Sequence, residues 1–416
     1  MTQARSALLR LLVLAPFPPR RDGVHGGARV TAELLARLSQ ECAVALIYLR
    51  GPTEPSADDV LTERLHHLEE VRYGHDAELG RVRDLFLAYS ALIRGIPTWT
   101  RGLWVPAFED KLRELVRSWR PDIVQLEYTG MGQYVAALRD SRARRVLVEY
   151  DPAFAAAQDI VARTRGPLKL RARTEALAWK RFERRILRSM DAVVVVSERD
   201  ARVIKTFDSS IRVAVIPLGA EVPERALDPV GVPPPTLLFV GSFVHPPNVD
   251  AAVRLARNIF PPLTDTHPDL RLSIVGHAPP SEIRALADSR IAIHGDVPAV
   301  TPYLERATVV VVPVRMGGGT RVKVLEALAA GKAVVASPRA LEGITAQPGT
   351  HLLVADSDDE FRVAVTALLE APSRRLELGS AAHRWAANSL SWEPHVASFV
   401  RLYESLLSSG PSEPSS

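Results

Sequence analysis

Short runs of uninterrupted apolar residues alternate with segments that place apolar residues at helical spacing. In the first half, these patterns predict strands over 8–15, 43–49, 123–127, 145–150, 192–196 and 213–216, and helices over 28–39, 107–119, 132–139, 168–188 and 198–207. Wholly apolar strands separated by helices are typical of a parallel sheet covered on both faces. The pattern therefore predicts an α/β fold.

A second series of the same kind follows residue 235. Strands are predicted over 236–240, 271–275, 291–294, 309–314, 333–336 and 352–355, and helices over 249–259, 281–287, 301–305, 320–330, two across 358–388, and 391–407. Residues 51–105 are the least regular, with short polar helices and an apolar piece at 85–93. Two doubly wound, Rossmann-like domains are expected, with a cleft between the carboxyl ends of their strands.

The domain boundaries are predicted from the proline-rich stretch 221–235, which reads as a linker. The first domain would cover 1–220 and the second 236–390. A helix over 391–408 would cross back to the first domain, and 409–416 would form a disordered tail rich in serine and proline.

The segment 307–337 carries the clearest chemical signal. A buried strand is followed by Gly317, Gly318 and Gly319, then by a helix with Thr320 as its predicted N-cap. Glycines allow the backbone to approach a ligand closely, and a helix start offers unpaired N–H groups to an anion.

Two cations occupy the first turn of this predicted helix, where the helix dipole disfavours positive charge. Arg321 and Lys323 are best explained if an external anion, such as a diphosphate, binds there. Glu326 follows about one turn later and is positioned to accept hydrogen bonds from sugar hydroxyls. The same loop contains neither a phosphate-binding-loop motif nor a dinucleotide fingerprint.

Charge and cysteine content exclude several classes. The formal net charge is only +4, so overall charge does not call for nucleic acid, and no recognition module is present. A single cysteine, Cys42, excludes an intramolecular disulfide and a cysteine-based zinc site. No apolar run reaches the roughly 18 residues of a membrane span. A cytoplasmic protein is expected, and the excess of arginine and alanine points to a bacterial source.

The positive charge is concentrated in 163–188, which holds ten Lys and Arg against Glu175 and Glu183. Apolar residues are interleaved with these cations. The stretch would either dock on anionic lipid at the inner membrane face or form a solvated helix face.

The residues also match a known family. The second half resembles the retaining nucleotide-sugar-dependent glycosyltransferases of group four, which have the GT-B fold; the matching segments are 237–251, 270–279, 291–337 and 341–344. The first half follows the family pattern more loosely at 26–39, 122–134, 181–204 and 213–222. The resemblance covers most of the chain from 8 to about 405 and is weakest over 51–105.

This resemblance implies a division of roles. The second domain would bind a nucleotide diphosphate sugar and the first an acceptor, and a hexose-type sugar would be transferred with retention, without a metal or other cofactor. The implied donor-binding residues are Gly26, Gly27, Ser242, Asn248, Val297, Gly317, Gly318, Gly319, Thr320, Arg321, Lys323 and Glu326, of which Arg321, Lys323 and Glu326 would be catalytic. Val297 would lie near the base and Glu326 at the ribose.

On the acceptor side, Glu127, Tyr150 and Asp151 are the candidates. Glu127 follows a buried strand, so it is either an acceptor contact or half of a buried polar pair with Tyr128. The acceptor itself, whether a lipid-linked saccharide, a polysaccharide or a small metabolite, is not specified.

The sequence departs from the family pattern at four positions. Gly318 replaces a frequent acidic residue, Ser242 and Pro247 replace a basic pair, and Tyr150 replaces a histidine. These departures keep two alternatives open: a non-catalytic protein that binds nucleotide sugar or glycan, and another GT-B enzyme such as a phosphorylase or an epimerase.

Two histidines have local alternatives. His25, beside Gly26, would either assist at the phosphates or be a loop residue without function. His245 and Asn248 would either contact the donor or form a structural turn in which Asn248 caps the following helix.

Overall fold

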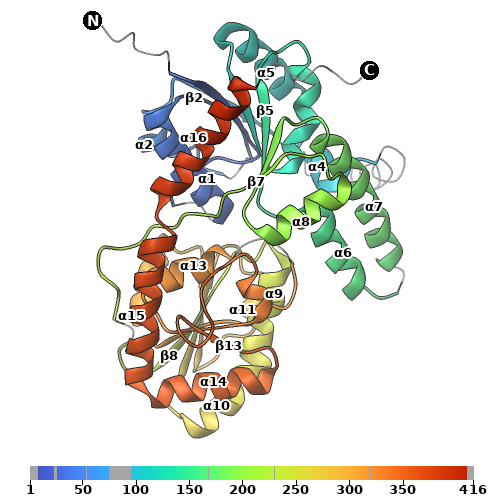
Figure 1. Ribbon diagram of the computed structural model, residues 1–416. Coiled ribbons are helices and arrows are strands. Elements are labelled where there is room, and N and C mark those ends of the chain that lie inside the picture. The colour runs from blue at the N-terminus through green and yellow to red at the C-terminus, as the bar shows by residue number, and fades with distance from the viewer. Residues whose placement is uncertain are drawn as a thin grey trace, which may run out of the picture. The chain divides into compact units, whose positions relative to one another are not determined.

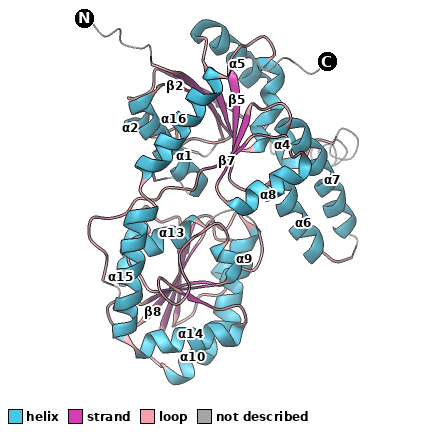
Figure 2. Ribbon diagram, in the orientation of Figure 1, coloured by secondary structure: helices cyan, strands magenta, loops and turns pink. Residues whose placement is uncertain are grey.

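The computed structural model describes residues 8–22, 26–52, 54–74, 95–166, 168–228, 230–317 and 321–409 (Figures 1 and 2). His25, Gly318, Gly319, Thr320, the predicted apolar piece 85–93 and residues 410–416 of the tail lie outside these ranges. Contacts divide the chain into two units. The first comprises Met1–Arg21, Thr31–Pro217 and Pro394–Ser416, and the second comprises Asp22–Val30 and Leu218–Glu393.

The first unit contains a parallel sheet of seven described strands in the order β3-β2-β1-β4-β5-β6-β7. These are β1 (Arg10–Ala15), β2 (Ala43–Arg50), β3 (His67–Arg72), β4 (Ile123–Glu127), β5 (Arg144–Glu149), β6 (Ala192–Val195) and β7 (Val213–Val215). Its helices are α1 (Gly26–Glu41), α2 (Asp59–Thr62), α4 (Thr98–Gly102), α5 (Pro106–Trp119), the 3₁₀ segment η2 (Thr129–Leu138), α6 (Ala153–Arg163), α7 (Leu168–Leu187), α8 (Glu198–Phe207) and α16 (Trp392–Ser408).

The second unit contains a parallel sheet of six described strands in the order β10-β9-β8-β11-β12-β13. The strands are β8 (Thr236–Val240), β9 (Arg271–Gly276), β10 (Ile291–Gly295), β11 (Val309–Val312), β12 (Val334–Ala336) and β13 (Leu353–Val354). The helical segments are α9 (Pro246–Arg254), the π-helical turn η3 (Leu255–Ile259), α10 (Phe260–Thr266), α11 (Ser281–Arg284), α12 (Thr301–Arg306), α13 (Val322–Ala329), the 3₁₀ turn η4 (Pro338–Leu341), α14 (Asp358–Glu370) and α15 (Pro372–Ser389).

The prediction of two parallel α/β sheets is confirmed, and the burial of the strands explains why the pattern was legible. Every residue of β4, β6 and β11 is buried, as expected for strands covered on both faces. Helix starts follow local chemistry as well: the Ser197 hydroxyl accepts from the Asp200 N–H at the start of α8, and Ser357 forms a capping box with Glu360 before α14.

Strand order determines where a ligand fits in such a sheet. In the second unit the chain runs outward from β8 through β9 to β10, then returns to the other side of β8 with β11. The reversal between β8 and β11 is a topological switch point, and ligands of open α/β sheets bind at the carboxyl ends of the strands there. The first unit has the corresponding point between β1 and β4.

Three elements of the first unit differ from the predictions or were not predicted. The strand His67–Arg72 was missed because it is a polar edge strand, HLEEVR, without an apolar run. The segment predicted as a helix over 132–139 is instead the 3₁₀ segment η2. Its glycines pack tightly: a Cβ on Gly130 would lie 2.4 Å from the Trp99 ring, and one on Gly132 would lie 2.4 Å from Ile186. The helix Ala153–Arg163 was also not predicted.

The last helix contributes to the core of the first unit. Tyr403 on α16 is fully buried, and its hydroxyl donates to the Gln125 side chain on β4. The Arg212 guanidinium donates to the Ser405 hydroxyl at 2.7 Å. Within the described ranges, no helix is long and apolar enough to cross a bilayer.

Ala278 provides a test of the backbone after β9. Its φ of +50° lies in the left-handed region, which a side chain disfavours by about 1–2 kcal/mol. Replacement by glycine relieves this strain but costs about 0.4–1 kcal/mol through the unfolded chain. We therefore expect Ala278→Gly to raise the free energy of unfolding of the second unit by up to about 1 kcal/mol.

Thermal and denaturant unfolding would measure this effect. The matched control is Ala292→Gly, an exposed position on β10, which should lose about 0.5–1 kcal/mol. Equal destabilisation by the two substitutions would contradict a strained backbone at Ala278.

Candidate functional site

A group of charged and polar side chains lies where β8 and β11 end. The backbone is closely packed there: a Cβ on Gly276 would lie 1.7 Å from the carbonyl oxygen of Gly241, so the ends of β9 and β8 meet without an intervening side chain. A Cβ on Gly241 would in turn lie 2.9 Å from Lys323 Nζ. Glycine at both positions lets the loop after β8 lie directly against Lys323.

Lys323 is the central cation of this group. Its ammonium donates to Asn248 Oδ1 at 2.7 Å and lies 4.6 Å from the centre of the Phe239 ring. Burial and the neighbouring Arg321 lower the pKa of Lys323 to about 7. The amide and the ring face hold the ammonium in place, so the charge remains available to an incoming anion.

Arg321 lies just before the helix. The structure begins α13 at Val322, two residues later than predicted, and places Arg321 at the cap position with a non-helical backbone (ψ 89°). Its guanidinium donates to the carbonyl oxygens of Met316, at 3.2 Å, and Gly317, at 2.7 Å. Arg321 thereby ties the glycine loop to the helix start.

Gly317 requires its glycine for two reasons. Its φ is +84°, and a Cβ there would lie 2.8 Å from the Pro247 ring. Its carbonyl also accepts from Arg339 Nε at 2.8 Å. The loop is therefore held from two sides at its described end.

Glu326 has a partner that sequence reasoning missed. Arg29 Nη2 lies 2.9 Å from Glu326 Oε1, and both side chains are about a quarter exposed. Burial raises the pKa of Glu326, while Arg29 and Lys323 act in the opposite direction. Arg29 lies three residues after Gly26 in a glycine-led helix start, but nothing in the local pattern connects it to a position 297 residues later.

At this site, the Ser242 hydroxyl and Arg29 Nε are buried and lack a hydrogen-bond partner in the described part of the chain. Buried polar groups are nearly always paired, so such atoms are expected where a ligand completes the bonding. Ser242 thus remains a candidate contact despite lacking the charge of the family pattern.

The loop after β8 corrects one prediction. Asn248 was predicted as either a donor contact or an N-cap, but α9 begins at Pro246 and His245 holds the cap position. A proline needs no N–H partner in the first turn, so the helix starts earlier than expected. Asn248 instead donates from Nδ2 to the Ser242 carbonyl at 2.7 Å and accepts from Lys323. Burial and the two cations lower the pKa of His245.

The glycines at 26 and 27 form the first turn of α1. A Cβ on Gly26 would lie 3.1 Å from the Val322 side chain, so Gly26 and the start of α13 are close neighbours within the second unit. The structure thus brings Gly26, Arg29, Ser242, Asn248, Gly317, Arg321, Lys323 and Glu326 together.

The neighbouring strand ends carry a second polar group. Asp296, after β10, accepts from the Ala278 N–H at 2.9 Å and contacts His277 Nδ1 at 2.6 Å. Its backbone φ of +55° is unusual for a non-glycine residue. The predicted base-side residue Val297 follows and packs partly buried against the core of the second unit.

The acceptor candidates of the first unit lie at the carboxyl ends of β4 and β5. Glu127 is fully buried, accepts from the Tyr150 hydroxyl at 2.7 Å and from Gln125 Nε2 at 2.6 Å, and has its pKa raised to about 7 by burial. The ring of Tyr150 lies 4.8 Å from that of Tyr128. Glu127 is thus a satisfied buried group, although its partner is Tyr150 rather than Tyr128. Asp151 is half-buried at the same edge.

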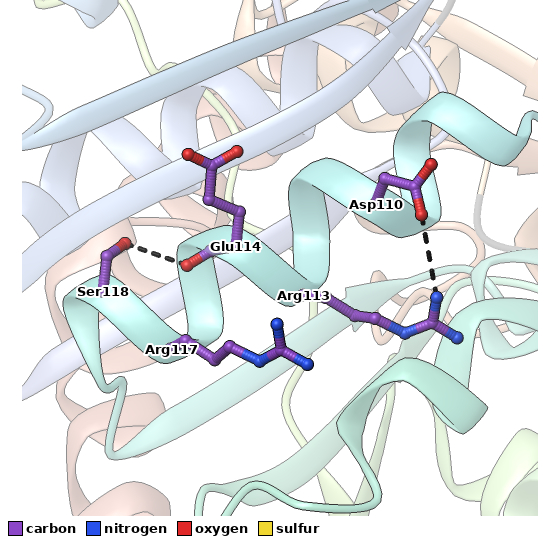
Figure 3. A pocket seen from close by; sticks show the side chains of 5 residues that line it. All are labelled: Asp110, Arg113, Glu114, Arg117 and Ser118. Atoms are coloured by element: carbon purple, nitrogen blue, oxygen red, sulfur yellow. Dashed lines mark hydrogen bonds and ion pairs between the residues drawn. The ribbon is translucent and has the colours of Figure 1, made fainter.

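A surface hollow on α5 carries no such arrangement. It is lined by Asp110, Arg113, Glu114, Arg117 and Ser118, all from one helix (Figure 3). Arg113 is paired with Asp110 at 3.7 Å, and Ser118 donates to the Glu114 carbonyl at 2.9 Å. No strand end lines it, in contrast to the usual ligand sites of α/β sheets.

The chemistry of the main site follows from its parts. The start of α13, Lys323 and Arg321 supply positive potential for a dianion or trianion, and Glu326 supplies a carboxylate that accepts from hydroxyls. A ligand with a diphosphate next to a polyhydroxy ring matches this set.

Comparison with known families agrees with this reading. Residues 234–371 match the family described as "Glycosyl transferases group 1", and residues 24–222 match the one described as "Glycosyltransferase Family 4". A search of curated protein sequences finds no match.

Solved structures share the fold at low sequence identity. A sucrose-phosphate synthase from Thermosynechococcus elongatus has a TM-score of 0.71 at 16% identity, covering 96% of this chain and 100% of that one. Anabaena HepE in complex with UDP has a TM-score of 0.58 at 13% identity, and the match covers 95% of this chain and 100% of that one. An Escherichia coli trehalose-6-phosphate protein bound with UDP-2-fluoroglucose has a TM-score of 0.62 at 14% identity, and the match covers 95% of this chain and 99% of that one.

The two family matches together span most of both units, and the matched structures have the same fold. The chain therefore belongs to the group-four glycosyltransferases of the GT-B fold and transfers a sugar from a nucleotide sugar.

Proposed function

We propose that this chain transfers a hexose-type sugar from a nucleoside diphosphate sugar to an acceptor hydroxyl, with retention of anomeric configuration and without a metal ion. The observation that carries the proposal is the arrangement around Lys323. An ammonium with a lowered pKa, a guanidinium at a helix start and an unpartnered buried serine hydroxyl meet at the switch point of the second sheet. Developing phosphate charge needs such preorganised positive groups.

In the proposed reaction, the bond between the anomeric carbon and the β-phosphate oxygen breaks, and both bonding electrons leave with the phosphate. Lys323 and Arg321 stabilise that negative charge in place of a metal. The acceptor oxygen bonds to the same face of the sugar, and its proton passes to the departing phosphate. Glu326 accepts from the ribose hydroxyls, and Arg29 holds that carboxylate in position.

The acceptor is proposed to approach the carboxyl edge of the first sheet. Glu127 and Tyr150 hold each other there as a buried pair, so they would shape the wall, while the half-buried Asp151 is placed to contact the acceptor. A lipid-linked saccharide, a polysaccharide and a small metabolite all present the hydroxyl that this scheme requires.

UDP is the first ligand to test, because two solved structures of similar fold hold UDP or UDP-2-fluoroglucose. Lys323→Met removes a charge-assisted hydrogen bond, which contributes about 1.5–3 kcal/mol. We expect UDP affinity, measured by calorimetry, to fall about 10- to 100-fold.

The matched control is Lys205→Met, an exposed lysine on α8, which should leave UDP affinity unchanged. Arg321→Met should also weaken binding. Wild-type affinity in both Lys323→Met and Arg321→Met would contradict the phosphate site.

The pKa of Lys323 predicts a pH dependence. In the free protein this pKa is held at about 7, and a bound diphosphate would raise it. Binding therefore takes up a proton above pH 7, and UDP affinity should fall by up to about tenfold per pH unit between pH 7.5 and 9.

Lys323→Arg provides the control, because arginine stays protonated throughout this range. Its UDP affinity should be nearly flat with pH, and calorimetry in buffers of different ionisation enthalpy should show that proton uptake is lost. An equally steep profile in this variant would assign the dependence to another group.

Retention and catalysis can be tested without a known acceptor. With an α-linked UDP-sugar, slow hydrolysis should release the α-anomer first, as seen by NMR before mutarotation. Because the proposed reaction uses no metal ion, a chelator should leave the hydrolysis rate unchanged within about twofold. A twofold change in rate corresponds to a change in the activation barrier of about 0.4 kcal/mol. Initial release of the β-anomer would contradict retention, and tight binding without turnover would favour the non-catalytic alternative.

A further inference from the structure

The helical hairpin formed by α6 and α7 carries a surface that sugar transfer does not use. The two helices pack against each other at one margin of the first unit (Figure 1). Four of the fourteen large apolar residues exposed in the described ranges belong to it: Ile160 (61%), Leu168 (66%), Leu170 (71%) and Leu177 (55%). Single exposed apolar residues are ordinary, but a gathering of them on one element indicates an interaction surface.

The outward face of α7 combines these leucines with cations. Leu170, Arg173, Leu177, Arg181 and Arg184 are all exposed and follow the i, i+3, i+7, i+11, i+14 spacing of one helical stripe. Lys169, Arg171, Lys180 and Arg185 flank the stripe. We refer to these nine residues as the α7 face.

The acids of α7 do not neutralise this face, because both turn inward. Glu175 accepts from the Thr98 N–H at 2.7 Å and from the Thr98 hydroxyl at 2.8 Å. Glu183 is fully buried and accepts from the Phe154 N–H at 2.9 Å. The exposed charge that α7 itself presents is therefore entirely positive.

The opposite side of α7 packs into the first unit. Ala176, Ala178, Phe182, Ile186 and Leu187 are buried, and the Trp179 ring lies 6.2 Å from that of Trp99 on α4. One stripe thus anchors the helix in the first unit while the other is left to solvent. Packing of the buried stripe does not account for the exposed leucines of the other stripe, which lower solubility. Their presence therefore indicates an interaction outside the first unit's core.

We propose that the α7 face docks on an anionic lipid bilayer, with Leu170 and Leu177 entering the headgroup boundary and the arginines contacting lipid phosphates. Charge complementarity selects an anionic partner, since interfacial helices use basic residues in this way. The leucines distinguish a bilayer from a nucleic acid or acidic glycan, because a polyanion without an apolar phase gives them no partner. The surface lies wholly in the first unit and does not depend on the nucleotide site.

The test is flotation of the full-length protein with vesicles of 30% phosphatidylglycerol in phosphatidylcholine, about the anionic content that gives a negative surface potential, against pure phosphatidylcholine. We expect flotation with the anionic vesicles only, weakened by salt. Leu170→Ser with Leu177→Ser, and separately Arg173→Gln with Arg184→Gln, should each reduce partitioning by about tenfold.

Matched controls carry the same chemistry elsewhere. Val363→Ser with Leu376→Ser removes exposed apolar residues from α14 and α15, and Arg202→Gln with Lys205→Gln removes exposed cations from α8; neither should change partitioning. The UDP affinity of each variant, measured independently of flotation, shows whether the variant is folded and whether its nucleotide site is intact.

Two outcomes would overturn the proposal. Equal flotation with neutral and anionic vesicles would remove the electrostatic basis. Undiminished flotation of the double leucine variant would show that the leucines do not enter the bilayer and that the α7 face binds anionic groups through charge alone.

Discussion

The close approach of two backbones, at Gly276 and Gly241, is the constraint on which the nucleotide site depends. With 1.7 Å between a hypothetical Cβ on Gly276 and the Gly241 oxygen, any side chain would push the strand ends apart. The loop after β8 would move with them, and Ser242 and Asn248 would no longer meet Lys323. The charges of the site are thus positioned by the absence of side chains at Gly241 and Gly276.

A second feature of the site is that neutral groups help to orient its two phosphate-side cations. Lys323 is bonded to an amide and faces an aromatic ring, and Arg321 is bonded to two carbonyl oxygens. Full ion pairs would cancel the potential that an anion senses, whereas dipoles orient the cations and leave most of it. Glu326 differs from the two cations because it forms an ion pair with Arg29. This pairing fits a carboxylate that accepts hydrogen bonds from hydroxyls and does not bind phosphate.

How much of this could be predicted depended on how local each signal was. Arg321, Lys323 and Glu326 share one strand–turn–helix segment, so periodicity and helix electrostatics were sufficient to group them. The Arg29–Glu326 pair joins positions 297 apart, and no property of a single sequence connects them. The polar edge strand β3 was missed because it buries only one residue fully, and the start of α9 was misplaced because prolines were taken as a turn.

The lowered pKa of Lys323 has a consequence for the end of the catalytic cycle. On the proposed mechanism, the nucleoside diphosphate leaves with the acceptor's proton on its terminal phosphate. Once that phosphate has ionised, the product carries one more negative charge than the sugar ester it came from, so it binds the protonated Lys323 more firmly than the substrate does. Deprotonation of Lys323 would then weaken the binding of this product. Inhibition by the released nucleotide should therefore be strongest in mildly acidic surroundings and relax as the medium becomes alkaline.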